Sequence, residues 1–69
     1  MKIGIIGCAG RMGQALIREV NYNEKTTLSG GVDREESPHI GKDLGAIANI
    51  ENLNLKATHN IEELIKNSD

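Results

Sequence analysis

Glycine recurs at every third position near the start of the chain, at Gly7, Gly10 and Gly13. In that arrangement glycine permits a sharp turn, lets a pyrophosphate approach main-chain N–H groups, and allows a helix to pack close to a strand. A β-branched apolar run beginning at residue 2 precedes the glycines, and residues 14–20 follow them with helical periodicity. The segment therefore predicts a strand, a glycine-rich turn and a helix that together bind the phosphates of a dinucleotide.

An acidic residue and an arginine follow the next predicted strand. That strand is predicted over residues 26–32, and Asp33 and Arg34 stand at its carboxyl end, twenty residues after Gly13. A carboxylate there can accept hydrogen bonds from both ribose hydroxyls, which favours NADH, whereas a guanidinium pairs with the 2′-phosphate of NADPH. With both residues present, we expect either cofactor to bind with less than about a hundredfold preference, or roughly 2.7 kcal/mol.

Three of these residues have simpler interpretations as well. Cys8 stands beside a predicted helix N-terminus, which can lower a thiol pKa, but a small side chain that fills space under a phosphate is the favoured interpretation. Arg11 is either a phosphate ligand or a solvated residue of the first helical turn. Asp33 could simply end a strand in a turn, although its spacing from the glycines favours ribose binding.

Several segments of the chain carry a family resemblance. They are Gly7-Cys8-Ala9-Gly10-Arg11-Met12-Gly13, Gly30-Gly31-Val32-Asp33-Arg34, Ser37 and Ile40-Gly41-Lys42-Asp43-Leu44-Gly45. Through them the chain resembles the amino-terminal part of the 4-hydroxy-tetrahydrodipicolinate reductases (dihydrodipicolinate reductases) over essentially its whole length. The arginine and methionine inside the turn are more specific to that family than a generic glycine fingerprint.

The resemblance implies a reaction and a cofactor site. The reaction is a step of lysine and diaminopimelate biosynthesis, in which a hydride passes from NADH or NADPH to a cyclic unsaturated dicarboxylate. The implied cofactor-binding residues are Gly7, Cys8, Ala9, Gly10, Arg11, Met12 and Gly13 around the pyrophosphate, Asp33 at the adenosine ribose and Arg34 at a 2′-phosphate. In relatives the catalytic residues belong to a second, carboxyl-terminal domain, so no catalytic residue is assigned to this chain.

The expected fold class is α/β, the first portion of a Rossmann-type dinucleotide-binding domain with a parallel sheet and flanking helices. A complete domain of this kind has two βαβαβ halves, and 69 residues amount to about one. We therefore expect residues 1–69 to be a truncated NAD(P)-binding domain, with the substrate and tetramerisation domain outside this chain. The resemblance further implies a homotetramer for the full-length protein.

Local patterns predict the other elements and the buried faces. Residues 55–59 are a candidate third strand, and residues 42–49 form either a short helical turn or an irregular segment. The first helix is expected to use one face that carries Met12, Leu16 and Val20. The last helix is expected to have Asn60 as its N-cap, Glu62 and Glu63 near its positive end, Lys66 near its negative end, and Ile61, Leu64 and Ile65 as its buried stripe.

Composition argues against several other classes of function. The net charge is −2 and the basic residues are scattered, so a nucleic-acid partner is not expected. The apolar stretches are too short to span a membrane, and a single cysteine without an export signal predicts a cytoplasmic location. His39 and His59 have no companion ligands nearby in sequence, so no metal site is expected.

Two alternatives to the reductase remain open at this point. A non-catalytic NAD(P)-sensing or interaction module would keep the phosphate cradle without the chemistry. An extended short-chain dehydrogenase also uses G-x-x-G-x-x-G, and only the pairs Arg11-Met12 and Asp33-Arg34 argue against it here. A P-loop is excluded, because no Gly-Lys-Ser/Thr closes the glycine turn.

Overall fold

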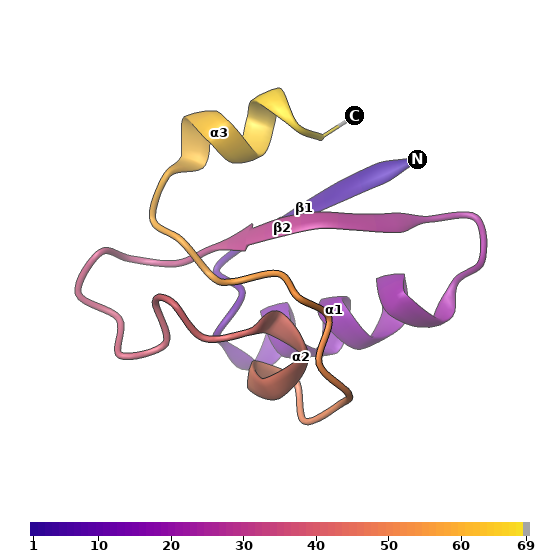
Figure 1. The fold of residues 1–69 in the computed structure, drawn as a ribbon, viewed down its shortest axis with the longest axis horizontal. Helices are drawn as coiled ribbons and strands as arrows, with labels where there is room; N and C mark the ends of the chain where they lie inside the picture. The colour runs from indigo at the N-terminus through magenta and orange to yellow at the C-terminus, as the bar shows by residue number, and fades with distance from the viewer. Residues whose placement is uncertain (69) are drawn as a thin grey trace.

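The computed structural model describes residues 1–68 of the chain. In chain order its elements are β1 (Lys2–Ile6), α1 (Arg11–Tyr22), β2 (Thr27–Val32), α2 (Leu44–Ile47) and α3 (Ile61–Lys66). The two strands pair in parallel, with α1 and α2 on one face of the sheet and α3 on the other (Figure 1). The predicted α/β class, a parallel sheet with flanking helices, is therefore confirmed.

Parallel pairing brings the carboxyl ends of the two strands to the same edge of the sheet. Lys2 pairs with Thr27 at one end and Ile6 pairs with Val32 at the other. Parallel neighbours need a crossover connection, which α1 supplies. The turn that follows β1 and the residues that follow β2 consequently leave the sheet side by side.

The core lies between the sheet and the layer formed by α1 and α2. Ile5 of β1 and Ile17 of α1 are 3% and 0% exposed, and Leu44 at the start of α2 is also fully buried. The buried cluster consists of Ile5, Cys8, Ile17, Leu44, Ile47, Ala48 and Ala57. Because phenylalanine and tryptophan are absent from the chain, aliphatic side chains supply this packing.

The buried face of α1 shares only Val20 with the predicted one. Gly13, Ile17 and Val20 are its buried residues, whereas Met12 and Leu16 are 75% and 43% exposed. The prediction from apolar spacing was right for Val20 and wrong for Met12 and Leu16, because the closest contact of the helix is made by a glycine. A Cβ at Gly13 would lie only 2.2 Å from the Gly7 carbonyl oxygen, so the absence of a side chain fixes which face meets the turn.

The predicted third strand is wrong as a regular strand. Within the described part of the chain, residues 55–59 contribute only two isolated bridges, one between Val32 and Thr58 and one between Asp43 and Lys56. The first is parallel and the second is antiparallel, so the segment changes partners within a few residues. This short extended stretch therefore lies between the start of α2 and the end of β2 and adds no third strand to the sheet.

Asp43 ties this extended stretch to α2. Its carboxylate accepts hydrogen bonds from the backbone N–H groups of Gly45, Ala46, Leu53 and Leu55. Burial raises the pKa of Asp43 and these N–H donors lower it by more, so the pKa lies below its ordinary value of 3.8. Of the two alternatives for residues 42–49, a short helical turn or an irregular segment, the structure has the short helix α2.

The last helix is capped as predicted but buries less than predicted. The Asn60 side chain accepts a hydrogen bond from the Glu63 N–H at 3.1 Å, which confirms the N-cap. Leu64 is the buried residue of α3, whereas Ile61 and Ile65 are 41% and 65% exposed. Leu64 packs on the sheet over Gly4 and Gly30, two positions without a side chain. The short α3 therefore contacts the sheet mainly through this one residue.

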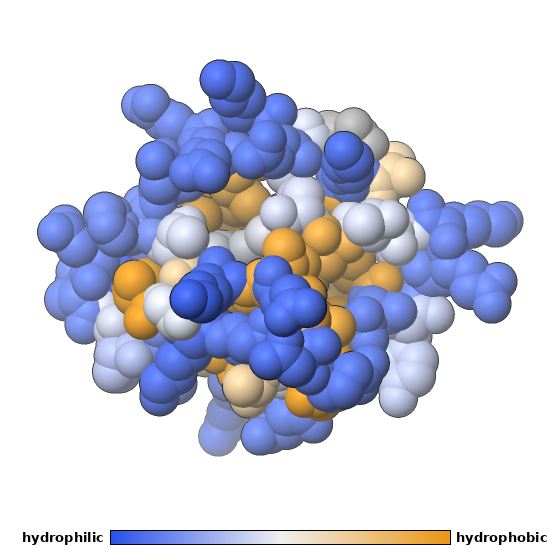
Figure 2. Space-filling model, viewed as in Figure 1, coloured by the Kyte–Doolittle hydropathy of each residue, from blue (hydrophilic) through white to orange (hydrophobic). Residues whose placement is uncertain are grey.

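Hydrophilic residues cover most of the face seen in Figure 2, with apolar patches between them. The exposed large apolar residues of the described chain are Met1, Ile6, Met12, Leu16, Tyr22, Ile61 and Ile65. A chain of this size buries a smaller fraction of its surface than a larger domain does. Its stability consequently depends on a few close contacts and hydrogen bonds.

One such contact predicts a large effect of a small substitution. Gly13→Ala places a methyl group against the backbone of Gly7 and Cys8, which cannot move aside as a flexible side chain could. We expect a loss of more than about 2 kcal/mol of unfolding free energy, measured by urea denaturation. Gly10→Ala is the control, because its Cβ would meet the Gly7 carbonyl at 3.5 Å, an ordinary contact. Equal losses for the two variants would contradict this packing.

The hydrogen bonds of Asp43 predict a dependence of stability on pH. Because the pKa of Asp43 is lowered by folding, its stabilising contribution is present above pH 3.8 and is lost as the pH falls through the folded-state pKa. We expect the difference in unfolding free energy between the natural chain and Asp43→Asn to shrink below pH 3.8. Urea denaturation at a series of pH values measures it. A difference that stays constant down to the acid limit would show that the charged form contributes nothing.

Candidate functional site

The glycine-rich turn between β1 and α1 is held by the last residue of β2. The N–H groups of Gly7 and Cys8 both donate to the Val32 carbonyl oxygen, at 2.7 and 3.1 Å. Gly7 has φ of +76°, a left-handed conformation that glycine adopts without strain, and the Gly10 N–H donates back to its carbonyl at 3.1 Å. The predicted sharp turn is therefore present, and it is fixed to the neighbouring strand.

The N-terminus of α1 has no side-chain cap. Gly10 is the N-cap, no side chain accepts from the first N–H groups, and no acidic residue occupies the first turn. An α-helix leaves its first N–H groups without intrahelical partners, and together with the helix dipole they favour an anion. The side chain of Gln14 is occupied elsewhere, since its amide donates to the Ala9 carbonyl at 2.9 Å. The main chain of Arg11, Met12 and Gly13 can therefore donate to a phosphate.

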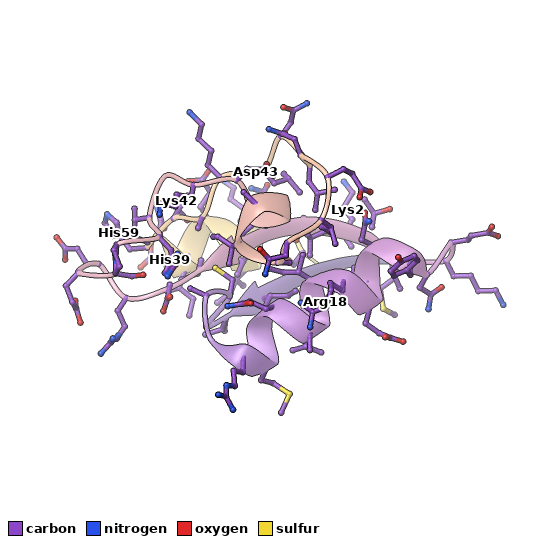
Figure 3. The ribbon with its side chains drawn as sticks, turned by 90° about the horizontal axis from the view of Figure 1, so that it is seen from below. Lys2, Arg18, His39, Lys42, Asp43 and His59 are labelled. Atoms are coloured by element: carbon purple, nitrogen blue, oxygen red, sulfur yellow. The ribbon has the colours of Figure 1, made fainter. Side chains whose placement is uncertain are left out.

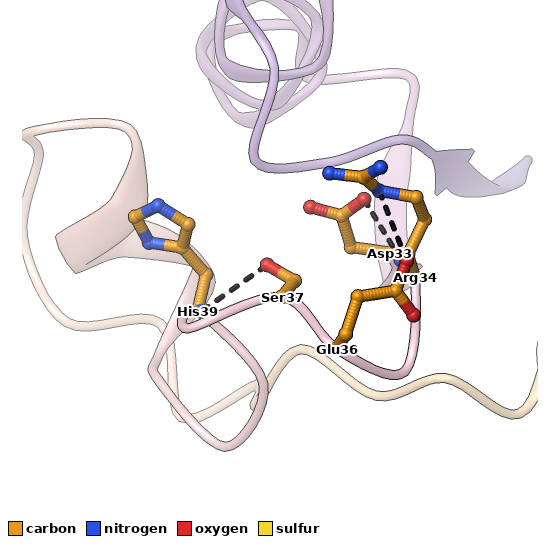
Figure 4. A network of polar contacts seen from close by, with 5 residues as sticks. All are labelled: Asp33, Arg34, Glu36, Ser37 and His39. Atoms are coloured by element: carbon orange, nitrogen blue, oxygen red, sulfur yellow. Dashed lines mark hydrogen bonds and ion pairs between the residues drawn. The ribbon is translucent and has the colours of Figure 1, made fainter.

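Asp33 and Arg34 lie next to this turn. Ile6, Gly7, Val32, Asp33 and Arg34 line one shallow hollow, although the glycine turn and Asp33 are far apart in sequence. Figure 4 shows the Asp33 and Arg34 side chains lying against the segment that leaves β1. The structure thus brings the two sequence-predicted groups of residues to one place.

The Asp33 backbone is fixed by the extended segment that follows residue 52. Its N–H donates to the Thr58 carbonyl at 2.9 Å, and its carboxylate accepts from the Arg34 N–H at 2.9 Å. Thr58 was not among the predicted site residues. It carries no side-chain chemistry that would mark it in the sequence, because it acts through its carbonyl group.

Arg34 is exposed and has an acidic neighbour. Its Nε lies 3.7 Å from Oε1 of Glu36, and the two side chains are 79% and 71% exposed (Figure 4). Exposed ion pairs of this kind contribute at most about 1 kcal/mol, so the guanidinium can change partners at little cost. Glu36 is not among the predicted site residues, and here it lies where it would compete with a phosphate for Arg34.

Cys8 is a packing residue of the turn. Cys8 is 0% exposed. A Cβ added to Gly31 would lie 2.9 Å from the Cβ of Cys8, so the Cys8 side chain packs against β2 at a position that has no side chain. Burial raises the pKa of the Cys8 thiol, and the negative charge of Asp33 raises it further. The alternative of a reactive thiol with a lowered pKa is therefore wrong, and Cys8 fills space beneath the turn.

Arg11 and Met12 project from the first turn of α1 into solvent. Both are exposed. Among the described residues, the ion pair near the turn joins Arg34 and Glu36, and Arg11 is not part of it. Arg11 is accordingly available beside the helix N-terminus, which is what either of its two interpretations requires. The side chain of Met12 is 75% exposed, and its main-chain N–H belongs to the uncapped first turn of α1.

The remaining polar residues form no further centre. His39 and His59 lie on loops at one end of the molecule (Figure 3). Across the described residues, His, Cys, Asp and Glu make no group of three or more that could hold a metal ion. Over the same residues, no helix is long and apolar enough to cross a membrane.

Comparison with known proteins agrees with this geometry. The family model described as dihydrodipicolinate reductase, N-terminus, matches residues 1–69. Curated relatives named 4-hydroxy-tetrahydrodipicolinate reductase include one from the Wolbachia endosymbiont of Brugia malayi, 39% identical over the whole chain and 26% of its own length. The relative from Parvibaculum lavamentivorans is 43% identical over the whole chain and 26% of its own length.

A third relative of the same name, from Rhizobium rhizogenes, is 47% identical over 84% of this chain and 21% of its own length. The chain thus spans about a quarter of the length of the curated relatives that it matches over its full extent. The matched quarter contains the glycine turn, Asp33 and Arg34, which are the residues brought together here. The chain belongs to the dihydrodipicolinate reductase family and corresponds to its amino-terminal part.

Proposed function

We propose that this chain is the NAD(P)H-binding part of a reductase that transfers a hydride to the cyclic unsaturated dicarboxylate dihydrodipicolinate, in lysine and diaminopimelate biosynthesis. The observation that carries the proposal is the single hollow at which the glycine turn meets Asp33 and Arg34. The names of the relatives support the reaction. The substrate-binding residues and a homotetrameric assembly belong, in this proposal, to the part of the protein outside residues 1–69.

The residues present fit a dinucleotide. The uncapped N-terminus of α1 offers main-chain N–H groups to the pyrophosphate, and the space around Gly7 is open, because a Cβ there would meet nothing within 4 Å. Asp33 would accept hydrogen bonds from the adenosine ribose. The pyrophosphate would be bound by residues 7–13, with Arg11 beside it. The bound nicotinamide supplies the hydride, and this chain binds and orients the other half of the cofactor.

Asp33 and Arg34 together set the preference between the two cofactors. Asp33 favours a free 2′-hydroxyl, since its carboxylate would repel a 2′-phosphate, whereas Arg34 would pair with that phosphate. The ion pair with Glu36 reduces the advantage of NADPH, because Arg34 must leave Glu36 to bind it. We infer that both cofactors bind, within about a hundredfold of one another.

Variants of these two residues test the cofactor site. Asp33→Ala should weaken NADH binding by about 1.5 to 3 kcal/mol, the scale of hydrogen bonds to a charged group. Arg34→Ala should weaken NADPH more than NADH, and Glu36→Gln should tighten NADPH slightly while leaving NADH unchanged, because it frees Arg34. Fluorescence titration of both cofactors gives the dissociation constants. Equal, small effects of Asp33→Ala and Arg34→Ala on both cofactors would reject the assignment.

Turnover by the full-length protein tests the reaction. We expect dihydrodipicolinate to cause oxidation of NADH and NADPH, followed as the loss of reduced-cofactor absorbance. The Asp33→Ala variant should require more NADH for the same rate, because its effect lies in cofactor binding. Tight cofactor binding without any substrate-dependent oxidation would instead identify a non-catalytic NAD(P)-sensing module.

A further inference from the structure

We propose that Asp43 is a positioning residue of the cofactor site, acting through the extended segment 53–58 to hold Asp33 at the end of β2. The inference rests on the proposed function, because it concerns the residue that would bind the adenosine ribose. Asp43 itself lies at the start of α2 (Figure 3) and is not among the residues that line the hollow.

The carboxylate of Asp43 joins two parts of the chain. Oδ2 accepts from the N–H groups of Gly45 and Ala46, at 2.8 and 3.3 Å, as the N-cap of α2. Oδ2 also accepts from the Leu53 N–H at 2.9 Å, and Oδ1 accepts from the Leu55 N–H at 2.9 Å. A cap alone needs only the first pair, so the second pair has a separate effect, which is to hold segment 53–58 in place.

Main-chain hydrogen bonds carry this constraint along the segment. The Leu44 N–H donates to the Leu55 carbonyl at 2.7 Å, and the Ala57 N–H donates to the Lys42 carbonyl at 2.8 Å. The Gly41 N–H donates to the Ala57 carbonyl at 2.8 Å. Residues 41–44 and 55–57 therefore form a short antiparallel pair around the bridge between Asp43 and Lys56.

The constraint ends at Asp33. Thr58 directly follows this pair, and its N–H donates to the Gly31 carbonyl at 3.0 Å. Its carbonyl in turn accepts the Asp33 N–H at 2.9 Å. The Asp33 carboxylate accepts its hydrogen bond from the adjacent Arg34 N–H, so the direction in which the carboxylate points depends on where the backbone of these two residues is held. Releasing segment 53–58 would therefore disturb the ribose-binding carboxylate without touching it.

Two substitutions separate this role from helix capping. Asp43→Ser keeps an N-cap residue for α2 but has a single oxygen, which cannot also reach the N–H groups of Leu53 and Leu55. Asp43→Asn keeps an oxygen in the place of Oδ2 and puts an amide N–H donor in the place of Oδ1, where it faces the Leu55 N–H. Arg18→Gln is the matched control, since Arg18 donates its hydrogen bond to the Ala48 carbonyl at the end of α2, at 3.2 Å, and not to segment 53–58.

The experiment is an NADH titration of the full-length protein, with each change made in the natural background and in Asp33→Ala. We expect Asp43→Ser and Asp43→Asn to raise the NADH dissociation constant about tenfold with Asp33 present, and less than about twofold in Asp33→Ala, because coupled residues are not additive. Arg18→Gln should leave the constant unchanged in both backgrounds. If Asp43→Asn does not fold, Asp43→Ser carries the test.

The amide exchange rate of Asp33 gives a second readout. It should increase in Asp43→Ser, whereas the exchange of the Gln14 N–H, which is bonded to the Gly10 carbonyl at 2.9 Å, should not. Unchanged NADH binding in Asp43→Ser, or equal weakening in both backgrounds, would overturn the proposal. A failure of Asp33→Ala alone to weaken NADH would instead reject the ribose-binding role on which it rests.

Discussion

The carbonyl oxygen of Val32 is the acceptor on which the candidate site depends. It accepts hydrogen bonds from the N–H groups of both Gly7 and Cys8, which hold the glycine turn at the end of β2. Val32 immediately precedes Asp33, and one peptide group consequently links the glycine turn to the carboxylate that we propose binds the ribose. Parallel pairing makes this possible, because it brings the carboxyl ends of both strands to one edge of the sheet.

The site is supported from below by packing and from beside by hydrogen bonds. Cys8 fills the space under the turn against Gly31, and the missing side chain of Gly13 lets α1 pack directly against the backbone of Gly7 and Cys8. On the other side Thr58 holds Asp33, and Asp43 holds the segment that carries Thr58. These supports need only small residues and main-chain groups, which suits a chain with no large aromatic core.

Sequence reasoning succeeded where the determinant is local. The glycine turn, the parallel strands and the Asn60 cap each follow from a few adjacent residues, and all three are present. It failed at the buried face of α1, because the decisive contact belongs to Gly13, a residue that apolar spacing does not count. It also missed the hydrogen bonds from Leu53 and Leu55 to Asp43, which join residues ten and twelve positions apart. No periodicity reports such contacts.

The acidic group beside the turn stands at the end of β2 and not at the N-terminus of α1. The N-terminus of α1 has no acidic residue in its first turn, so its N–H groups face no resident anion. The one group beneath the turn that could become negative is Cys8, and both burial and the charge of Asp33 raise its pKa and keep the thiol neutral. Asp33 therefore also acts on the turn through its charge, since its carboxylate disfavours a thiolate at Cys8.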